Sequence, residues 1–247
     1  MKSLRKKIFY LIFGFASSSV KRRISFLKTN LKRGGYHSIN ELDKQLEKYV
    51  NYDNGFYVEL GANDGINQSN SLFFELKRNW RGILIEPSPH NFLLCREQRS
   101  NQNHIFCNAC VSFDYKDKYV DIQYANLMSI SENLNLDLND KEAHIISAKN
   151  HLKETETVFS FGAIAATLNS LLEKGNAPKV IDFISLDVEG AELEVLKGIN
   201  FEDFSFKYML IEIRNLKPIK DFLIERGYVL EKQLSVHDFL FKCVKLD

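Results

Sequence analysis

The chain has 247 residues, of which 45% are hydrophobic and 26% are charged, a composition that supplies one sizeable core with a short extension and excludes a low-complexity chain. Its net charge is only +1, but ten of its 33 Lys and Arg residues and none of its 32 Asp and Glu residues lie in 1–40. The remaining residues hold 23 basic against 32 acidic side chains. This acidic excess argues against nucleic acid as the main substrate, because phosphate contacts need a positive face.

The N-terminal residues 1–35 form a basic arm in front of the single domain predicted over 36–247. An apolar stretch at 8–16 lies between two groups of Lys and Arg, and its nine residues are too few to span a bilayer, which needs about twenty. We expect either a cationic helix that lies on an anionic membrane surface through residues 1–33, or a helix packed on the domain. A secretory signal peptide is the less favoured alternative.

The segments after the arm alternate between helical and strand patterns. Ser38 and Glu41 predict a capping box at the start of a helix over 39–49. From Phe56 onward, short apolar runs alternate with helices, which predicts a parallel sheet covered on both faces. The predicted strands are 56–60, 82–85, 104–106 extending towards Val111, 119–124, 180–186, 208–213, and a final antiparallel hairpin of 228–231 and 239–244. The predicted helices are 69–78, 89–98, 141–152, 165–174, 191–197 and 219–226.

Acidic residues follow three of these strands at their carboxyl ends, where open α/β sheets bind ligands. In the first segment, Gly61 and Gly65 permit a tight turn and the close approach of a ligand to the backbone. The segment has neither the GxGxxG spacing of a dinucleotide site nor the Lys-Ser/Thr pair of a P-loop. Glu59 and Asp64 would repel a pyrophosphate and favour a cationic amino-acid group, an ordinary strand-to-helix turn being the alternative.

The second acid, Glu86, precedes Pro87 and lies 25 residues after Gly61, near the spacing at which an acid binds ribose hydroxyls. The third segment carries Asp187 and Glu189, with Gly190 relaxing the turn into the next helix. These carboxylates can orient a cationic group, act as a general base for a hydroxyl, or hold a divalent metal. The alternative is that Glu189 and its neighbour Glu192 stabilise the helix N-terminus.

The sequence resembles the FkbM family of S-adenosylmethionine-dependent methyltransferases. The matching pieces are YVELGANDG at 57–65, ILIEPSPHNF at 83–92, NACVS at 108–112, TLNSLL at 167–172 and FISLDVEGAELEVLKG at 183–198, in order over roughly 54–214. The resemblance implies a class I methyltransferase fold: a doubly wound α/β sheet of seven strands, mostly parallel, with the last strand antiparallel. It also implies O-methylation, often of sugar or polyketide-type hydroxyls. Residues 1–40 and about 114–156 lie outside the match and are where the acceptor would be selected.

The resemblance also assigns roles to residues. The methionine end of the cofactor would be held by the loop after the first strand, and its ribose by the acid after the second, with the adenine bordered by residues after the third. In that order the residues are Glu59, Gly61, Ala62, Asn63, Asp64 and Gly65; Glu86 and Pro87; and Asn108, Ala109 and Ser112. Asp187 would lie beside the transfer centre, with Glu189 as base or supporting residue. His237, in the predicted hairpin turn, is a further candidate base.

The function predicted from the sequence is therefore S-adenosylmethionine-dependent methyl transfer to a hydroxyl, that of a sugar in a glycan or glycolipid being favoured, with a divalent metal left open. The predicted location is cytoplasmic, peripheral association with the inner membrane face being a hypothesis. One alternative is a non-catalytic subunit of the same fold in a surface polysaccharide assembly complex, which the three intact acids disfavour. An NAD-dependent oxidoreductase is disfavoured by the missing GxGxxG.

Overall fold

The computed structural model describes residues 34–124, 130–131, 134 and 158–246. The basic arm at 1–33 and the helix predicted over 141–152 lie outside these residues. Among the helices of the described part, none has the length and apolar character needed to cross a bilayer.

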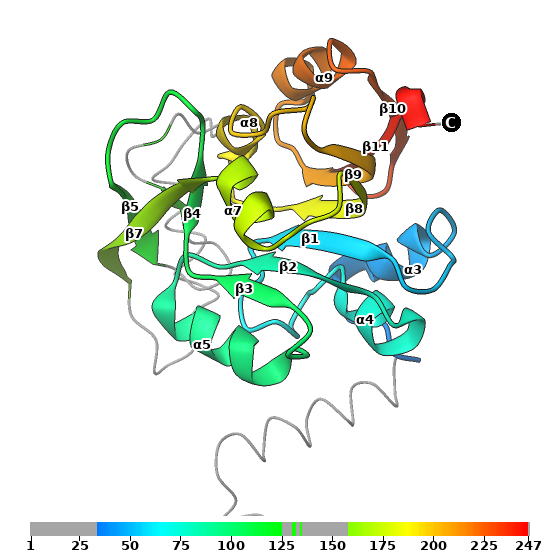
Figure 1. The fold of residues 1–247 in the computed structure, drawn as a ribbon, viewed down its shortest axis with the longest axis horizontal. Coiled ribbons are helices and arrows are strands. Elements are labelled where there is room, and N and C mark those ends of the chain that lie inside the picture. Colours follow the sequence, from blue (N-terminus) through cyan, green and yellow to red (C-terminus); the bar gives the residue numbers. More distant parts are fainter. Residues whose placement is uncertain (1–33, 125–129, 132–133, 135–157, 247) are drawn as a thin grey trace, which may run out of the picture.

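A large sheet of seven strands forms the centre of the molecule (Figure 1). Its strand order is β10-β11-β9-β8-β1-β2-β3, and the neighbours from β9 to β3 are all parallel, whereas β11 is antiparallel to both β9 and β10. The strands are β1 (Phe56–Leu60), β2 (Arg81–Ile85), β3 (His104–Phe106), β8 (Val180–Leu186), β9 (Ser205–Glu212), β10 (Tyr228–Gln233) and β11 (Asp238–Cys243). The predicted seven-stranded sheet with an antiparallel last strand is confirmed.

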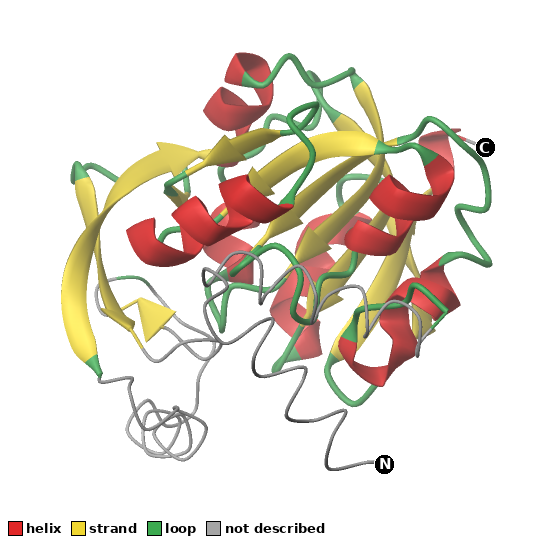
Figure 2. Ribbon diagram, turned by 90° about the horizontal axis from the view of Figure 1, so that it is seen from below, coloured by secondary structure: helices red, strands yellow, loops and turns green. Residues whose placement is uncertain are grey.

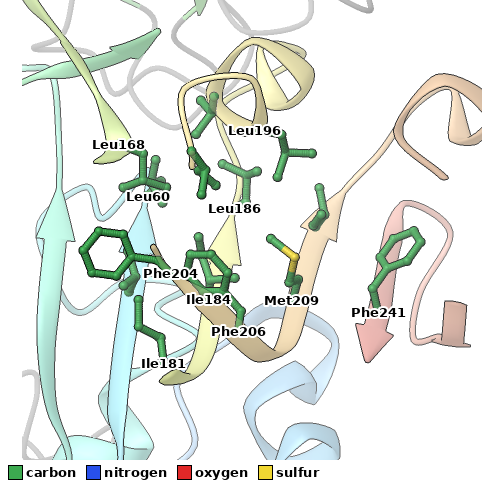
Figure 3. Packing of buried hydrophobic residues seen from close by; sticks show 14 of the residues in the cluster. Leu60, Leu168, Ile181, Ile184, Leu186, Leu196, Phe204, Phe206, Met209 and Phe241 are labelled. Atoms are coloured by element: carbon green, nitrogen blue, oxygen red, sulfur yellow. The ribbon is translucent and has the colours of Figure 1, made fainter. Parts of the chain in front are cut away.

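Helices cover both faces of this sheet because alternate strand residues point to opposite sides (Figure 2). On one face, Val58 of β1 and Ile184 of β8 pack with α7 (Leu168–Lys174), α8 (Glu192–Leu196) and α9 (Leu216–Ile224). Figure 3 shows part of this cluster, with Leu60 of β1 near Leu168 of α7 and Leu186 of β8 near Leu196 of α8. On the other face, Tyr57 and Phe183 pack with α3 (Leu42–Leu46), α4 (Leu72–Arg78) and α5 (Pro89–Gln98). The sheet is therefore doubly wound.

A second sheet, which the sequence did not predict, lies beside the carboxyl ends of the large one. Its order is β4-β7-β5-β6, with β4 (Ala109–Val111), β7 (Phe159–Thr167), β5 (Tyr119–Tyr124) and β6 (Ile130–Ser131). β4 pairs parallel to β7, and β7 and β6 both pair antiparallel to β5. The strand expected from 104 towards Val111 is thus two strands in two sheets, because pairing with β7 turns the chain away after Phe106.

Four predicted helix starts differ from the structure. The helices expected from residues 69 and 219 begin at Leu72 and Leu216. The helix expected over 165–174 begins at Leu168, where the Oγ1 atom of Thr167 accepts a 3.2 Å hydrogen bond from the Ser170 amide; the residues before it belong to β7. The helix expected over 39–49 is a 3₁₀ turn, η1 (Ile39–Glu41), followed by α3, and the predicted capping box is absent from it. Instead, the Ser38 hydroxyl donates to the Asp43 carboxylate at 2.6 Å. Here a local hydrogen bond to Asp43 replaces the expected one to Glu41.

Candidate functional site

A cavity of about 800 Å³ opens at the carboxyl ends of the parallel strands, a size typical of small-molecule sites. It lies where the strand order of the large sheet reverses, between β1 and β8, and its walls come from both sheets and from the β10–β11 turn. The cavity brings together most of the site residues expected from the sequence: Glu59, Gly61, Ala62, Asn63, Glu86, Pro87, Asn108, Ala109, Asp187, Glu189 and His237. Asp64, Gly65 and Ser112 are not among its described lining residues.

Gly61, directly after β1, lies against Asp187, the residue that follows β8. Its φ is +76°, and a Cβ atom at this position would lie 2.0 Å from the carbonyl oxygen of Asp187. The amides of Gly61 and Ala62 both donate to the carbonyl of Ile85, at 3.1 and 3.2 Å. A glycine is therefore required at position 61 because the end of β8 approaches so closely. The same approach places Asp187 beside the loop that follows β1.

The carboxylate of Glu59 is hydrogen-bonded to other residues of the protein, although Glu59 lines the cavity. Its carboxylate accepts hydrogen bonds from the hydroxyls of Ser69 and Ser71 and from the Asn70 amide, at 2.6–3.0 Å. It also lies 3.3 Å from Nη1 of Arg99, whose side chain is fully buried and whose Nε lies 2.8 Å from Glu75. Arg99 was not among the predicted site residues, because an arginine directly after a helix is an ordinary surface pattern.

Asp64 and Gly65 shape the loop from outside the cavity. The Asp64 carboxylate accepts the amides of Ile66 and Asn67 at 3.0 and 2.8 Å. Gly65 has φ +81°, and a Cβ atom there would lie 2.9 Å from the Arg99 side chain. Both residues therefore fix the path of the loop that carries Asn63 to the cavity.

Glu86 projects from the end of β2 and is buried. Its two carboxylate oxygens accept the amides of Asn63 and Ser88, each at 2.9 Å. Burial nevertheless raises the pKa of Glu86 to about 7. Farther along the same wall, Asn108 donates from Nδ2 to the Ile164 carbonyl at 3.1 Å, which joins this wall to the second sheet. Ser112 is buried below this wall.

Three carboxyl groups lie close together at the ends of β8 and β9, where they line the cavity. Oxygen atoms of Asp187, Glu189 and Glu212 all lie within 4.8 Å of one another. Glu212 was not predicted as a site residue, although it ends β9 much as Glu86 follows β2, and this strand-end position is a signal visible in the sequence. Arg214, also missed, places Nη2 2.8 Å from Glu189 and 3.7 Å from Glu212.

The crowding of these acids raises their proton affinity. Burial, followed by the charges of Glu212 and Glu189, raises the pKa of Asp187 well above its usual value, although its side chain is open to water through the cavity. Burial and the charge of Glu212 likewise raise the pKa of Glu189 to about 7, against the opposing effect of Arg214. The group can therefore hold or accept a proton near neutral pH.

Of the two acids proposed to support the following helix, only Glu192 does so. Its Oε1 accepts the amides of Val188 and Gly190, both at 3.1 Å, directly before α8. Glu189 has a left-handed backbone, with φ +54°, which directs it to Arg214 instead. In the segment after β8, Glu192 therefore binds backbone amides, whereas Glu189 lines the cavity.

His237 lies in the turn between β10 and β11, as the sequence predicted, and is exposed at the cavity wall. Its carbonyl accepts the Ile213 amide at 2.7 Å, which fixes the turn next to the end of β9. The neighbouring Asp238 also lines the cavity and is hydrogen-bonded to Ser235. The hairpin turn thereby places Asp238 next to Glu212 at the end of β9.

Comparison with known proteins gives a match to the methyltransferase FkbM domain over residues 59–230. No curated protein matches the chain. Among solved structures, M. capricolum TrmK in complex with S-adenosylhomocysteine has a TM-score of 0.41 and 8% identity, over 80% of this chain and 66% of that one. A precorrin-6y C5,15-methyltransferase from Geobacter metallireducens GS-15 has a TM-score of 0.39 and 13% identity, over 81% and 85%. A putative RNA methyltransferase from Pyrococcus horikoshii has a TM-score of 0.39 and 12% identity, over 84% and 82%.

Proposed function

Because the chain belongs to the FkbM methyltransferase domain family, we propose that it transfers the methyl group of S-adenosylmethionine to a hydroxyl oxygen, that of a sugar in a glycan or glycolipid. The observation that carries this proposal is the arrangement of the cavity. A glycine loop and a buried acid at the ends of β1 and β2 share one space with the carboxyl cluster at the ends of β8 and β9. The side at β1 and β2 can hold a cofactor, while the side at β8 and β9 can bind the acceptor and take up its proton.

The residues present fit this cofactor. Glu86, at the end of β2, would accept the ribose hydroxyls, for which a carboxylate is suited because it takes two such bonds at once. Asn70 supplies a further signal: its Oδ1 is buried at the cavity and has no hydrogen-bond partner among the described residues. It is available to accept the ammonium group at the methionine end. Asn108 and Ala109 would border the adenine.

Glu59 takes a different role in this proposal from the one expected. Because Arg99 and the 69–71 backbone and hydroxyls occupy its carboxylate, Glu59 would position the loop that binds the methionine end. The Glu59 carboxylate accepts the backbone amide of Asn70 and so fixes the position of Asn70, whose side-chain Oδ1 has no hydrogen-bond partner in the described part of the chain. This is a positioning function, and it explains why a buried acid and a buried arginine are paired beneath the loop.

When bound, the cofactor supplies a methyl group already activated on a sulfonium. The protein then has to orient the acceptor hydroxyl and remove its proton, and alignment alone supplies much of the acceleration. We assign proton removal to Asp187, a carboxyl group that follows β8 and lines the cavity beside Glu189 and Glu212. Glu212 would keep Asp187 in place through their hydrogen bond, and Arg214 holds Glu189 beside them. His237, in the β10–β11 turn next to the end of β9, is the second candidate base.

A divalent cation is an alternative source of positive charge for this cluster, since carboxylate oxygens are the ligands that Mg²⁺ prefers. Dialysis against EDTA followed by addition of Mg²⁺ separates the two arrangements. Loss and recovery of methyl transfer would support a bound ion. Unchanged transfer would support Arg214 as the charge partner.

The experiment that tests the function combines binding with product analysis. Calorimetric titration with S-adenosylhomocysteine is expected to show binding, and Glu86→Ala should raise Kd by at least about tenfold while the circular dichroism spectrum stays that of the wild type. Mass spectrometry of surface glycans from cells with and without the protein should show one CH₂ of mass per transferred methyl. Wild-type affinity in Glu86→Ala would remove Glu86 from the cofactor site.

The same experiment addresses the non-catalytic alternative. A structural subunit of a polysaccharide assembly complex would leave the glycan mass unchanged, whether or not it binds S-adenosylhomocysteine. We further propose that the basic residues 1–33 place the protein on the cytoplasmic face of an anionic membrane, near lipid-linked acceptors. Cosedimentation of the full chain with anionic vesicles, compared with a chain beginning at Gly34, tests this placement.

A further inference from the structure

The part of the cavity away from the Gly61 loop has apolar walls. Five apolar side chains line this part, two from β5, one from the segment after β6 and two from the β10–β11 turn: Val120, Ile122, Leu134, Leu234 and Val236. Val120 and Ile122 are buried side by side in β5, with their side chains on the cavity face of the second sheet. A molecule that occupies this space gains by placing an apolar face against them.

A polar atom within this wall has no partner in the described part of the protein. The hydroxyl of Ser131, on β6 opposite Ile122, lines the cavity, is 5% exposed and makes no hydrogen bond. A buried hydroxyl without a partner costs free energy, so such groups in native proteins call for an explanation. Its place in the cavity wall indicates a polar group of a bound molecule as the missing partner.

The floor between these walls has more acids than bases. Four carboxyl groups lie here, those of Asp187, Glu189, Glu212 and Asp238, and Arg214 is the only Lys or Arg among the described lining residues. Burial, together with the charge of Glu212, raises the pKa of Asp238 also. An anionic acceptor would therefore meet repulsion in a cavity where charges are poorly screened.

Arg214 offsets Glu189, from which its Nη2 lies 2.8 Å. The sulfonium of a bound cofactor would offset one more carboxylate. The remaining carboxyl groups have no further Lys or Arg among the described lining residues, which favours a positive group on the acceptor.

We propose that the acceptor is an amine-bearing hydroxyl compound such as an amino sugar, with its ammonium group against Asp238 and the carboxyl cluster, its apolar face on Val120 and Ile122, and a polar substituent bonded to Ser131. This rests on the proposed methyl transfer. The acceptor oxygen gains the methyl group as the sulfur–methyl bond breaks, the sulfur keeps the bonding electron pair, and the hydroxyl proton passes to a carboxylate oxygen of Asp187.

The test uses the full chain and acceptors that differ in one substituent: methyl glycosides of an amino sugar, of its N-acetyl derivative and of the corresponding uronic acid, in the gluco and galacto series. Transfer is followed with methyl-labelled S-adenosylmethionine after S-adenosylhomocysteine binding has been established. We expect kcat/KM for an amino sugar to exceed that of its N-acetyl derivative by at least about tenfold, and that of the uronic acid by more.

Two variants locate the preference in the cavity. Asp238→Asn should shrink the ratio between amino and N-acetyl acceptors, whereas the matched control Glu202→Gln, an exposed acid outside the cavity lining, should leave it unchanged. Ser131→Ala should raise the acceptor KM by about threefold to tenfold, since one hydrogen bond is lost. It should leave the Kd of S-adenosylhomocysteine and the melting temperature unchanged or improved, which a structural role for Ser131 would not allow.

The possible failures are distinguishable. Absence of S-adenosylhomocysteine binding overturns the proposed function and this inference with it. Binding of S-adenosylhomocysteine with equal or faster transfer to the uronic acid or N-acetyl compound, or with no transfer to any amino sugar, overturns the inference while the methyltransferase function stands. A product methylated on nitrogen rather than oxygen also overturns it.

Discussion

The two halves of the cavity manage their charges in opposite ways. On the side of β1 and β2, each carboxylate has dedicated partners: Glu59 has Arg99 and the 69–71 segment, and Glu86 has two backbone amides. On the side of β8 and β9, three carboxyl groups face one another with Arg214 as their cation among the described residues. The first half is ordered by its own hydrogen bonds, and the second holds charge that a ligand or a proton must balance.

This difference follows from what each half has to do. A site for a fixed cofactor benefits from groups that are already in place before binding, because less order has to be created on association. A site that removes a proton needs acids whose pKa values lie near the working pH, and mutual repulsion in a buried place provides this. Substitutions that disturb one half should therefore change stability and cofactor binding, and those in the other half should change turnover.

The largest effect on stability is expected from Arg99→Met. Removing this side chain leaves Glu59 and Glu75 buried without their cation, a change that costs about 3–5 kcal/mol in comparable sites. Urea unfolding monitored by circular dichroism measures the loss. Lys217→Met, which removes an exposed partner of Asp221, is the matched control and should unfold close to the wild type. Similar small losses in both variants would show that the first half does not depend on its buried ion pair.

In the second half, Asp187→Asn should lower kcat by at least about 10²-fold, the usual contribution of a general base. The Kd of S-adenosylhomocysteine and the unfolding midpoint should change little, since the amide keeps the shape of the side chain and removes a crowded charge. Glu202→Gln again serves as the control. A kcat within a few-fold of the wild type would transfer the role of base to Glu189 or His237.

Gly61→Ala tests the boundary between the halves. A Cβ atom would overlap the Asp187 carbonyl and occupy a left-handed backbone, so we expect a loss of about 1–3 kcal/mol in unfolding free energy together with weaker S-adenosylhomocysteine binding. At Gly162 of β7, a Cβ atom would meet its nearest neighbour at an ordinary 3.6 Å. If Gly61→Ala behaved like Gly162→Ala in both measurements, the close approach of β1 and β8 would be of no consequence.

The smallest effect, counted for one titrating group over one pH unit, is expected on the unfolding free energy as the pH changes. Glu86, Glu189 and Glu192 have pKa values raised from 4.5 to about 7, so the folded protein binds more protons than the unfolded chain between these values. The unfolding free energy of the unliganded protein should therefore fall as pH rises through this window, each group contributing on the order of 1 kcal/mol per pH unit. Thermal unfolding at several pH values, compared with Glu86→Gln, isolates one group. A Glu86→Gln profile parallel to the wild type would contradict the raised pKa of Glu86.

Much of the large sheet was predictable from local patterns. The strands at 56–60 and 180–186 and the helix at 89–98 have the observed bounds, because buried parallel strands are short continuous apolar runs and Pro89 begins a helix well. The second sheet was not predictable in this way. β7 consists of small and aromatic residues without clear alternation, and β4 has only three residues, so their pairing depends on contacts between segments far apart in the chain.

The sequence by itself determined the fold, the family and the strand ends at which Glu59, Glu86 and Asp187 lie, because these follow from patterns within a few neighbouring residues. Only the tertiary structure decided what each acid contacts. Arg99, 40 residues from Glu59 in the chain, neutralises it, while Glu212 comes within reach of Asp187 through the pairing of β8 with β9. The reason is physical: the chemistry of a carboxylate is set by the charges and hydrogen-bond donors packed around it, and these come from distant parts of the chain.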